Sequence, residues 1–170
     1  MHLVFSTLGL SGFSYQGKKP WPPLPREVTW WHRVTMEHTV IVGRTTWQAT
    51  LGSAPLAGRR LVVISSTLRH EEVPTGCALA RSLIDAMRLA KETCDVPAVC
   101  GGRDVLYQAL PFATRAFVFR VRGEDPVDVY FPAAARFTMY PWDIVSLEEH
   151  GADEANPRET CFIEYKRSKP

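Results

Sequence analysis

The chain has 170 residues, a formal net charge of +2 and a sequence pI near 8.4. This length allows one domain with a substantial core, and the mild charge argues against a nucleic-acid or membrane surface as partner. No apolar run in the sequence approaches membrane-spanning length. We therefore expect a single domain over residues 1–170, acting as a monomer in the cytoplasm.

The four cysteines are widely spaced and form no Cys-x-x-Cys pair, so zinc and dithiol sites have little support. We expect no metal and free thiols in a reducing compartment at Cys77, Cys94, Cys100 and Cys161. The basic segment 166–169 is typical of a solvated chain end.

Residues 3–8 are rich in β-branched and aromatic side chains and predict a buried first strand rather than a signal peptide. Residues 9–19 follow as a long glycine-containing loop without helical period. Long structured loops often act as lids, although a plain connector fits the same pattern.

A helix is predicted over residues 24–35, with Pro25 in the first turn, where a missing N–H does no harm. Glu27 lies near its positive end, on one face with Trp30, Trp31 and Val34. An ordinary solvated acid fits this position. An unpaired carboxylate buried among tryptophans would instead need a partner, and that partner could be a ligand.

Residues 39–42 predict a short buried strand, and Gly43 to Trp47 then open a helix. A strand, a glycine and a helix N-terminus form an anion-binding arrangement, to which Arg44 adds a forked cation. A capped helix with a surface arginine explains this pattern equally well.

The remaining elements alternate between strands and helices. Strands are predicted over 61–66, 78–80, 96–100 and 116–122, and helices over 82–94 and 103–110, with Ser82 as N-cap of the first of these helices. Gly101 and Gly102 would let a ligand lie against bare backbone at the strand-to-helix junction. Residues 144–149 and 160–167 predict a terminal antiparallel hairpin. The pattern indicates an α/β fold with a mostly parallel sheet and an antiparallel edge.

The order of these motifs resembles that of the dihydrofolate reductase family along nearly the whole chain. The matching pieces are Pro20-Trp21, Leu24-Pro25-x-Glu27, Trp30, Val40-Ile41-Val42-Gly43-Arg44-Thr45-Thr46-Trp47, Pro55-Leu56-x-Gly58-Arg59, Ser65-Ser66, Gly101-Gly102, Leu110-Pro111, Phe131-Pro132 and Cys161-Phe162. Each piece is weak alone, but the set in this order is highly specific.

The resemblance implies a dihydrofolate-reductase-like fold: a mixed, mostly parallel eight-stranded sheet with an antiparallel C-terminal hairpin, flanked by about four helices. It also implies NADPH-dependent reduction of 7,8-dihydrofolate to tetrahydrofolate, with hydride transfer to C6 of the pterin and protonation of N5. The expected partners are dihydrofolate and NADPH, with no nucleic acid and no membrane.

Glu27 matches the family's single active-site carboxylate, which can accept the donor pair of a pterin and favour protonation at N5 through water. Trp21 matches the residue that helps to hold this water and closes the loop 9–19. The positions that match the pterin pocket are Val4, Phe5, Val28, Trp31, Leu51, Leu56, Cys100 and Phe119. Arg59 matches the arginine that binds the α-carboxylate of the substrate's glutamate tail.

For the cofactor, the resemblance assigns a 2′-phosphate pocket to Arg44, Ser65, Ser66 and Arg81, which favours NADPH over NADH. It also implies a cis peptide between Gly101 and Gly102. The further matching cofactor positions are Ser6, Phe13, Ser14, Gly17, Gly43, Thr45, Thr46, Gly101, Gly102, Arg103, Asp104, Val105 and Leu106.

Five positions depart from the family pattern. Phe119 replaces a threonine that bonds the carboxylate, a loss of about 1–2 kcal/mol. Leu106 replaces a tyrosine, with Tyr107 one place later; Arg103 and Ser14 replace glycines; and Trp31 replaces a phenylalanine. We expect these changes to lower affinity for trimethoprim-like inhibitors rather than to change the reaction type.

Two other interpretations stay open. A riboflavin-pathway reductase would share the fold and cofactor but not the Pro-Trp and Glu-x-x-Trp stretch. A non-catalytic protein that binds folate or NADPH, or has a structural role, would keep the fold without turnover. Phe119 and Leu106 leave that interpretation open, whereas the retained residues Glu27, Trp21, Arg44 and Arg59 argue against it.

Overall fold

A computed structural model describes residues 1–93, 96–131 and 142–168. Cys94, Pro132 and Lys169 of the sequence predictions lie outside these residues. The described chain forms two compact units, a first unit of residues 1–4, 34–93 and 96–113 and a second unit of residues 5–33, 114–131 and 142–168. Strand β1 (His2–Leu8) contributes residues to both units. A single domain over the whole chain stays a prediction.

The first unit is built on parallel strands β3 (Val40–Gly43), β4 (Leu61–Ile64), β5 (Cys77–Ala80) and β6 (Ala98–Gly101). Their order is β5-β4-β3-β6, and the start of β1 pairs with β6 through His2 and Leu3. The apolar runs of β3 and β4 are almost wholly buried, as expected of strands covered on both faces.

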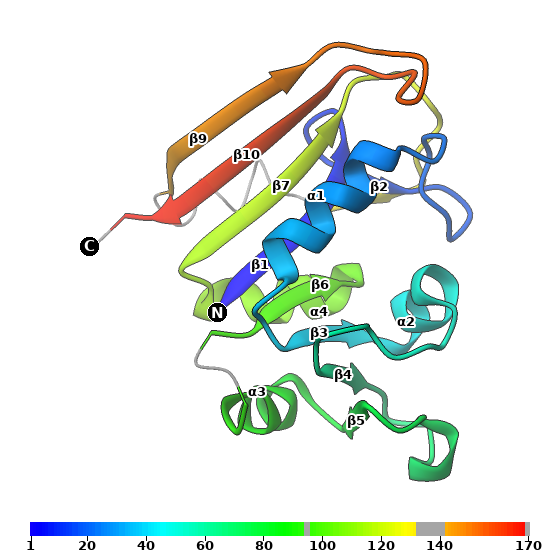
Figure 1. Ribbon diagram of the computed structural model, residues 1–170, viewed down its shortest axis with the longest axis vertical. Coiled ribbons are helices and arrows are strands. Elements are labelled where there is room, and N and C mark those ends of the chain that lie inside the picture. Colours follow the sequence, from blue (N-terminus) through cyan, green and yellow to red (C-terminus); the bar gives the residue numbers. More distant parts are fainter. Residues whose placement is uncertain (94–95, 132–141, 169–170) are drawn as a thin grey trace. The chain divides into compact units, whose positions relative to one another are not determined.

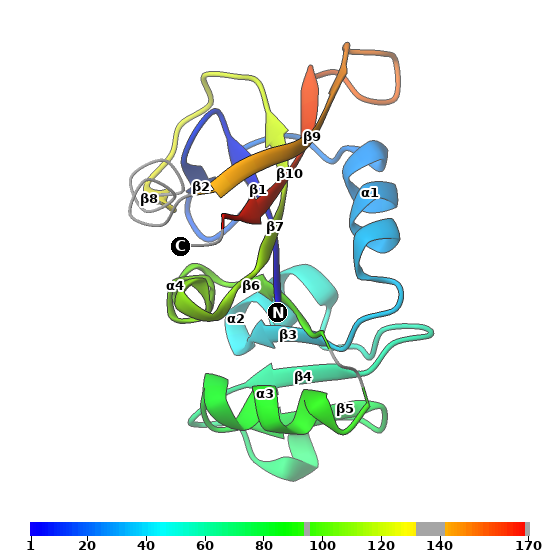
Figure 2. The same ribbon diagram turned by 90° about the vertical axis from the view of Figure 1, so that its left-hand side faces the viewer.

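This unit has three α-helices: α2 (Arg44–Leu51) connects β3 to β4, α3 (Leu83–Lys91) connects β5 to β6, and α4 (Arg103–Ala109) follows β6. Helix α3 packs on β4 and β5, as Figure 2 shows, and α4 packs on β6. Short 3₁₀ turns lie at η1 (His70–Glu72) and η2 (Leu110–Phe112). Ser82 caps α3 by accepting a hydrogen bond from Asp85 N at 3.1 Å, which confirms the predicted cap. The predicted end near residue 94 is wrong, since α3 ends at Lys91.

The second unit is largely antiparallel. It contains the rest of β1 together with β7 (Arg115–Val121), β10 (Thr160–Arg167) and β9 (Trp142–His150), in the order β1-β7-β10-β9. Strand β10 is antiparallel to both of its neighbours. Two short strands, β2 (Gly12–Ser14) and β8 (Val129–Tyr130), pair with each other, and β2 also pairs with β1.

Helix α1 (Pro25–Thr35) covers one face of β7 and β10 (Figure 1). The ring of Trp30 lies 5.5 Å from Phe119 and 6.0 Å from Phe162, and these two phenylalanine rings lie 5.1 Å apart. Aromatic contacts therefore fix the face of α1 that is turned to the sheet, and with it the position of its first turn.

The eight strands β5, β4, β3, β6, β1, β7, β10 and β9 and the four α-helices confirm the predicted fold class, with β2 and β8 added within the described residues. None of the described helices has the length and apolar character needed to cross a membrane.

The prediction that residues 9–19 lack regular structure is wrong in part. The segment contains β2, and Tyr15 and Lys18 then exchange backbone hydrogen bonds of 2.9 and 3.0 Å across a two-residue turn. Gln16 and Gly17 have φ values of 50° and 76°, the positive angles of a type I′ hairpin turn. A three-residue strand is too short to show an alternating pattern in the sequence.

Candidate active site

In the second unit, the carboxylate of Glu27 accepts hydrogen bonds from three side chains. It lies in the first turn of α1 and is only 5% exposed, so the alternative of a solvated first-turn acid is wrong. Ser6 Oγ and Lys19 Nζ each lie 2.5 Å from Oε1, and Trp21 Nε1 donates to Oε2 at 3.0 Å. Three donors and a positive charge thus hold this buried anion.

Two of these contacts differ from what the resemblance implies. Ser6 is implied at the cofactor, yet in this structure its hydroxyl bonds the carboxylate. Lys19 was not predicted at all, although it forms the ion pair with Glu27. Its only sequence signal is its place directly before Pro20 and Trp21, because it comes from a loop and follows no period.

The loop that carries Lys19 is tied to a distant part of the second unit. Gln16 N donates to Asp128 Oδ2 at 2.7 Å, and Asp128 N donates to Ser14 O at 3.1 Å. Ser14 and Gly17, both implied cofactor positions, therefore belong to a hairpin with fixed ends. Phe13, in β2, has its ring 6.2 Å from that of Phe131.

The second-unit residues implied for the pterin pocket differ in exposure. Phe119 is fully buried between Trp30 and Phe162, so the residue that replaces the family threonine is a core residue. Phe5 is buried against Phe131, Trp31 is half-buried, and Val28 is 56% exposed.

The first unit holds the other implied pterin-pocket residues. Val4 is fully buried, whereas Leu51, Leu56 and Cys100 are half-buried. Arg59 is 9% exposed and donates from Nη1 to Thr35 Oγ1. Burial lowers the pKa of this guanidinium, while Cys100 acts in the opposite direction. Arg59 is therefore a nearly buried cation that is oriented by its hydrogen bond to Thr35.

A cavity of about 470 Å³ in the first unit is lined by residues implied for the cofactor's 2′-phosphate. Four of these residues come from separate parts of the chain: Arg44 follows β3, Ser65 and Ser66 follow β4, and Arg81 follows β5. The lining residues are Arg44, Thr45, Ile64, Ser65, Ser66, Thr67, Arg81, Ser82, Leu83, Asp104, Val105 and Gln108.

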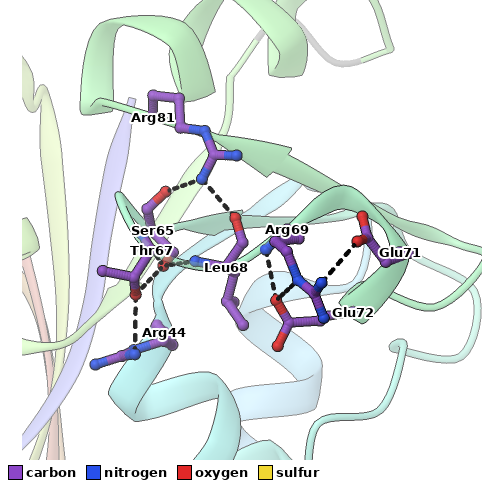
Figure 3. Close-up of polar contacts among 8 residues, drawn as sticks. All are labelled: Arg44, Ser65, Thr67, Leu68, Arg69, Glu71, Glu72 and Arg81. Atoms are coloured by element: carbon purple, nitrogen blue, oxygen red, sulfur yellow. Dashed lines mark hydrogen bonds and ion pairs between the residues drawn. The ribbon is translucent and has the colours of Figure 1, made fainter.

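The two arginines of this cavity are held by the segment after β4 (Figure 3). Arg44 Nη1 donates to Thr67 Oγ1 at 3.0 Å, and Arg81 Nη1 donates to the carbonyls of Ser65 and Leu68 at 2.8 and 2.6 Å. Ser65 Oγ in turn accepts hydrogen bonds from the backbone N–H groups of residues 67 and 68. The segment is thus shaped by its own bonds and presents two cations to one cavity.

The nearby carboxylate of Glu72 is paired with Arg69. Glu72 accepts a hydrogen bond from Arg69 N at 2.7 Å, as Figure 3 shows, and this bond lowers the pKa of the Glu72 carboxyl. Arg69 also pairs with Glu71 and Glu72, so these carboxylates face a cation within their own segment.

Two strand-to-helix junctions lie side by side, because β3 and β6 are paired. The Gly101–Gly102 peptide is cis, as the resemblance implies. A Cβ on Gly43 would lie 3.2 Å from Val105 Cγ2, and one on Gly102 would lie 3.1 Å from Thr46 Oγ1. A side chain at either junction would therefore press on its neighbour, which favours glycine there.

Both junctions also leave helix N–H groups without a side-chain cap, since Gly43 and Gly102 are the N-cap residues of α2 and α4. Such groups suit an anion such as a cofactor phosphate. Among the α4 residues implied for the cofactor, Arg103 pairs with Asp104 at 3.0 Å and Leu106 is fully buried.

Known proteins resemble this chain along most of its length. Residues 11–167 match the family model described as dihydrofolate reductase. The chain is 29% identical over 151 residues to the dihydrofolate reductase of Bacillus subtilis (strain 168), covering 87% of this chain and 83% of that one. It is 34% identical over 137 residues to that of Sus scrofa (71% and 73% covered) and 33% identical over 171 residues to that of Gallus gallus (91% and 87%).

Among solved structures, a dihydrofolate reductase from Enterococcus faecalis complexed with NADP(H) and RAB-propyl superimposes with a TM-score of 0.85 at 21% identity, covering 99% of this chain and 97% of that one. The fold is therefore that of a dihydrofolate reductase. The chain belongs to the dihydrofolate reductase family, whose members are NADPH-dependent oxidoreductases.

Proposed function

We propose that this protein catalyses the NADPH-dependent reduction of 7,8-dihydrofolate to 5,6,7,8-tetrahydrofolate. The observation that carries the proposal is the buried Glu27 carboxylate, held by Trp21 in the first turn of α1. A buried carboxylate that is kept anionic is the acceptor that the 2-amino group and neighbouring ring nitrogen of a pterin require.

In this reaction Glu27 orients the pterin and, through its negative charge, favours protonation of N5. Trp21 holds the second carboxylate oxygen in place by its hydrogen bond of 3.0 Å. Phe119 adds no donor to Glu27, and Ser6 supplies a hydroxyl to the carboxylate instead.

The residues present fit NADPH. Arg44 and Arg81 supply two cations to one cavity, and the uncapped starts of α2 and α4 supply N–H groups for its phosphates. When bound, NADPH supplies the hydride that C6 of the pterin accepts. Arg59 would bind the α-carboxylate of the glutamate tail.

The test is a mixture of protein, NADPH and dihydrofolate in which cofactor absorbance is followed. Glu27→Gln is expected to lower the rate near neutral pH by at least about 100-fold, because the charge that supports proton transfer is lost. The exposed Glu124→Gln is the matched control and should keep the wild-type rate. A Glu27→Gln rate equal to wild type would contradict the proposal. Tight binding of both ligands by the wild type without NADPH oxidation would favour the non-catalytic alternative.

We further propose reduced affinity for trimethoprim-like inhibitors. Trp31 adds bulk at a half-buried position, and Phe119 withholds a hydroxyl from the carboxylate. An inhibition constant equal to that of an ordinary bacterial dihydrofolate reductase would refute this.

We also propose that the protein acts as a monomer in the cytoplasm. Cys77 and Cys161 are free thiols, which a reducing compartment such as the cytoplasm favours. Sedimentation of a dimer would refute the monomer.

A further inference from the structure

The oxygens of Glu27 do not have room for a bidentate ligand in the arrangement described above. A carboxylate offers about two acceptor positions on each oxygen. Ser6 and Lys19 occupy both positions on Oε1, whereas Trp21 occupies one of two on Oε2. A ligand that donates one hydrogen bond to each oxygen must therefore displace a donor from Oε1.

Of the two donors on Oε1, Lys19 is the one able to leave. Ser6 lies within strand β1, whose backbone is fixed by its neighbours. The Lys19 side chain is 46% exposed, and its ammonium stands at the end of a flexible four-carbon stem. Its ammonium also lies 5.9 Å from the centre of the Trp21 ring. An ammonium that leaves Oε1 therefore keeps a favourable partner beside the carboxylate.

The charge of Lys19 thus stays at the site after displacement. A neutral pterin then meets a carboxylate and an ammonium whose charges cancel. A diaminopyrimidine pairs with a carboxylate as a protonated ring, so it adds a second positive charge to the same place. The ammonium of Lys19 and the protonated ring of the diaminopyrimidine repel each other when both lie beside Glu27. Because Lys19 is partly exposed, solvent and salt weaken this repulsion.

We propose that Lys19 is a specificity-determining residue: an internal counter-ion of Glu27 that pterins displace and that discriminates against cationic ligands. This inference rests on the proposed function for the identity of the ligand class. It differs from the effects of Trp31 and Phe119, because those act through shape and hydrogen bonding, whereas Lys19 acts through charge.

The experiment measures dissociation constants of folate and of trimethoprim by tryptophan fluorescence, without NADPH, for four proteins. Lys19→Met removes the charge at similar length and is expected to tighten trimethoprim relative to folate by about tenfold. Lys19→Arg keeps the charge and should keep the wild-type ratio. Lys18→Met is the matched control, since the neighbouring Lys18 is exposed, and it should also keep that ratio. Added salt should shrink the Lys19→Met difference.

An unchanged ratio in Lys19→Met, or an equal change in Lys18→Met, would overturn the inference. Folate is the internal reference, because a misfolded Lys19→Met would lose both ligands. In that case a further variant that lacks the charge, Lys19→Gln, decides: trimethoprim tightened relative to folate supports the charge effect, and an unchanged ratio overturns it. Folate binding without NADPH oxidation would count against the proposed reaction alone. Failure of the wild type to bind either ligand would overturn both.

Discussion

Restoring the family threonine at position 119 is expected to damage this protein rather than improve it. Phe119 is fully buried, and its ring contacts those of Trp30 and Phe162. Phe119→Thr removes most of that ring and leaves a cavity, a change that costs about 3–5 kcal/mol in comparable cores. The retained methyl group offsets little of this, since the new hydroxyl enters an apolar cluster.

We therefore expect Phe119→Thr to lower the free energy of unfolding by about 4 kcal/mol, a large share of the 5–15 kcal/mol typical of a domain. For a chain of this size the melting temperature should fall by roughly 8–16 °C. Thermal unfolding followed by tryptophan fluorescence measures it, with Phe112→Thr as control because Phe112 is 48% exposed. A fall of less than about 3 °C together with tighter folate binding would refute the reasoning, since the hydroxyl would then serve Glu27 as in the family pattern.

Two further predictions concern charge. Arg44→Gln should weaken NADPH binding by about tenfold or more but NADH binding much less, because the lost guanidinium belongs to the 2′-phosphate cavity; a fluorescence titration that shows equal losses for both cofactors would contradict this. Asp153 accepts hydrogen bonds from Asn156 that hold its pKa below the ordinary 3.8, so its contribution to stability is complete above that value and is lost as the pH falls through the lowered pKa. Wild type should therefore melt above Asp153→Asn at pH 7 and lose this advantage in strong acid, and a difference that is constant with pH would exclude the mechanism.

The fold was predictable because its signals are local. The continuous apolar runs of β3 and β4 have the composition of buried parallel strands, and the structure places them there with nearly no exposure. The cap at Ser82 was equally visible, since a hydroxyl three residues before an acid is a helix-start pattern. The end of α3 was harder to predict, because helix ends fray.

The candidate site was only half predictable. Glu27 stood out as an acid among tryptophans, and the family match named its role. Its ion pair with Lys19 follows no sequence period, because the contact depends on how a hairpin turn directs the loop toward Glu27. Likewise the hydrogen bond from Ser6 to Glu27 joins strand β1 to helix α1, and residue spacing in the sequence cannot reveal a contact between two elements.

The two-residue turn at Gln16 and Gly17 makes the length of this loop a constraint in its own right. A type I′ turn joins its two strands with only two residues, and the hydrogen bond from Gln16 N to Asp128 fixes the position of this turn. The distance along the chain from that anchor to Lys19 is therefore as much a part of the site as the lysine itself. Only Lys18 separates the turn from Lys19, so one inserted residue would change where the ammonium lies relative to Glu27. The loop is thus constrained in residue number, and in residue type chiefly at the turn, where both central positions have positive φ.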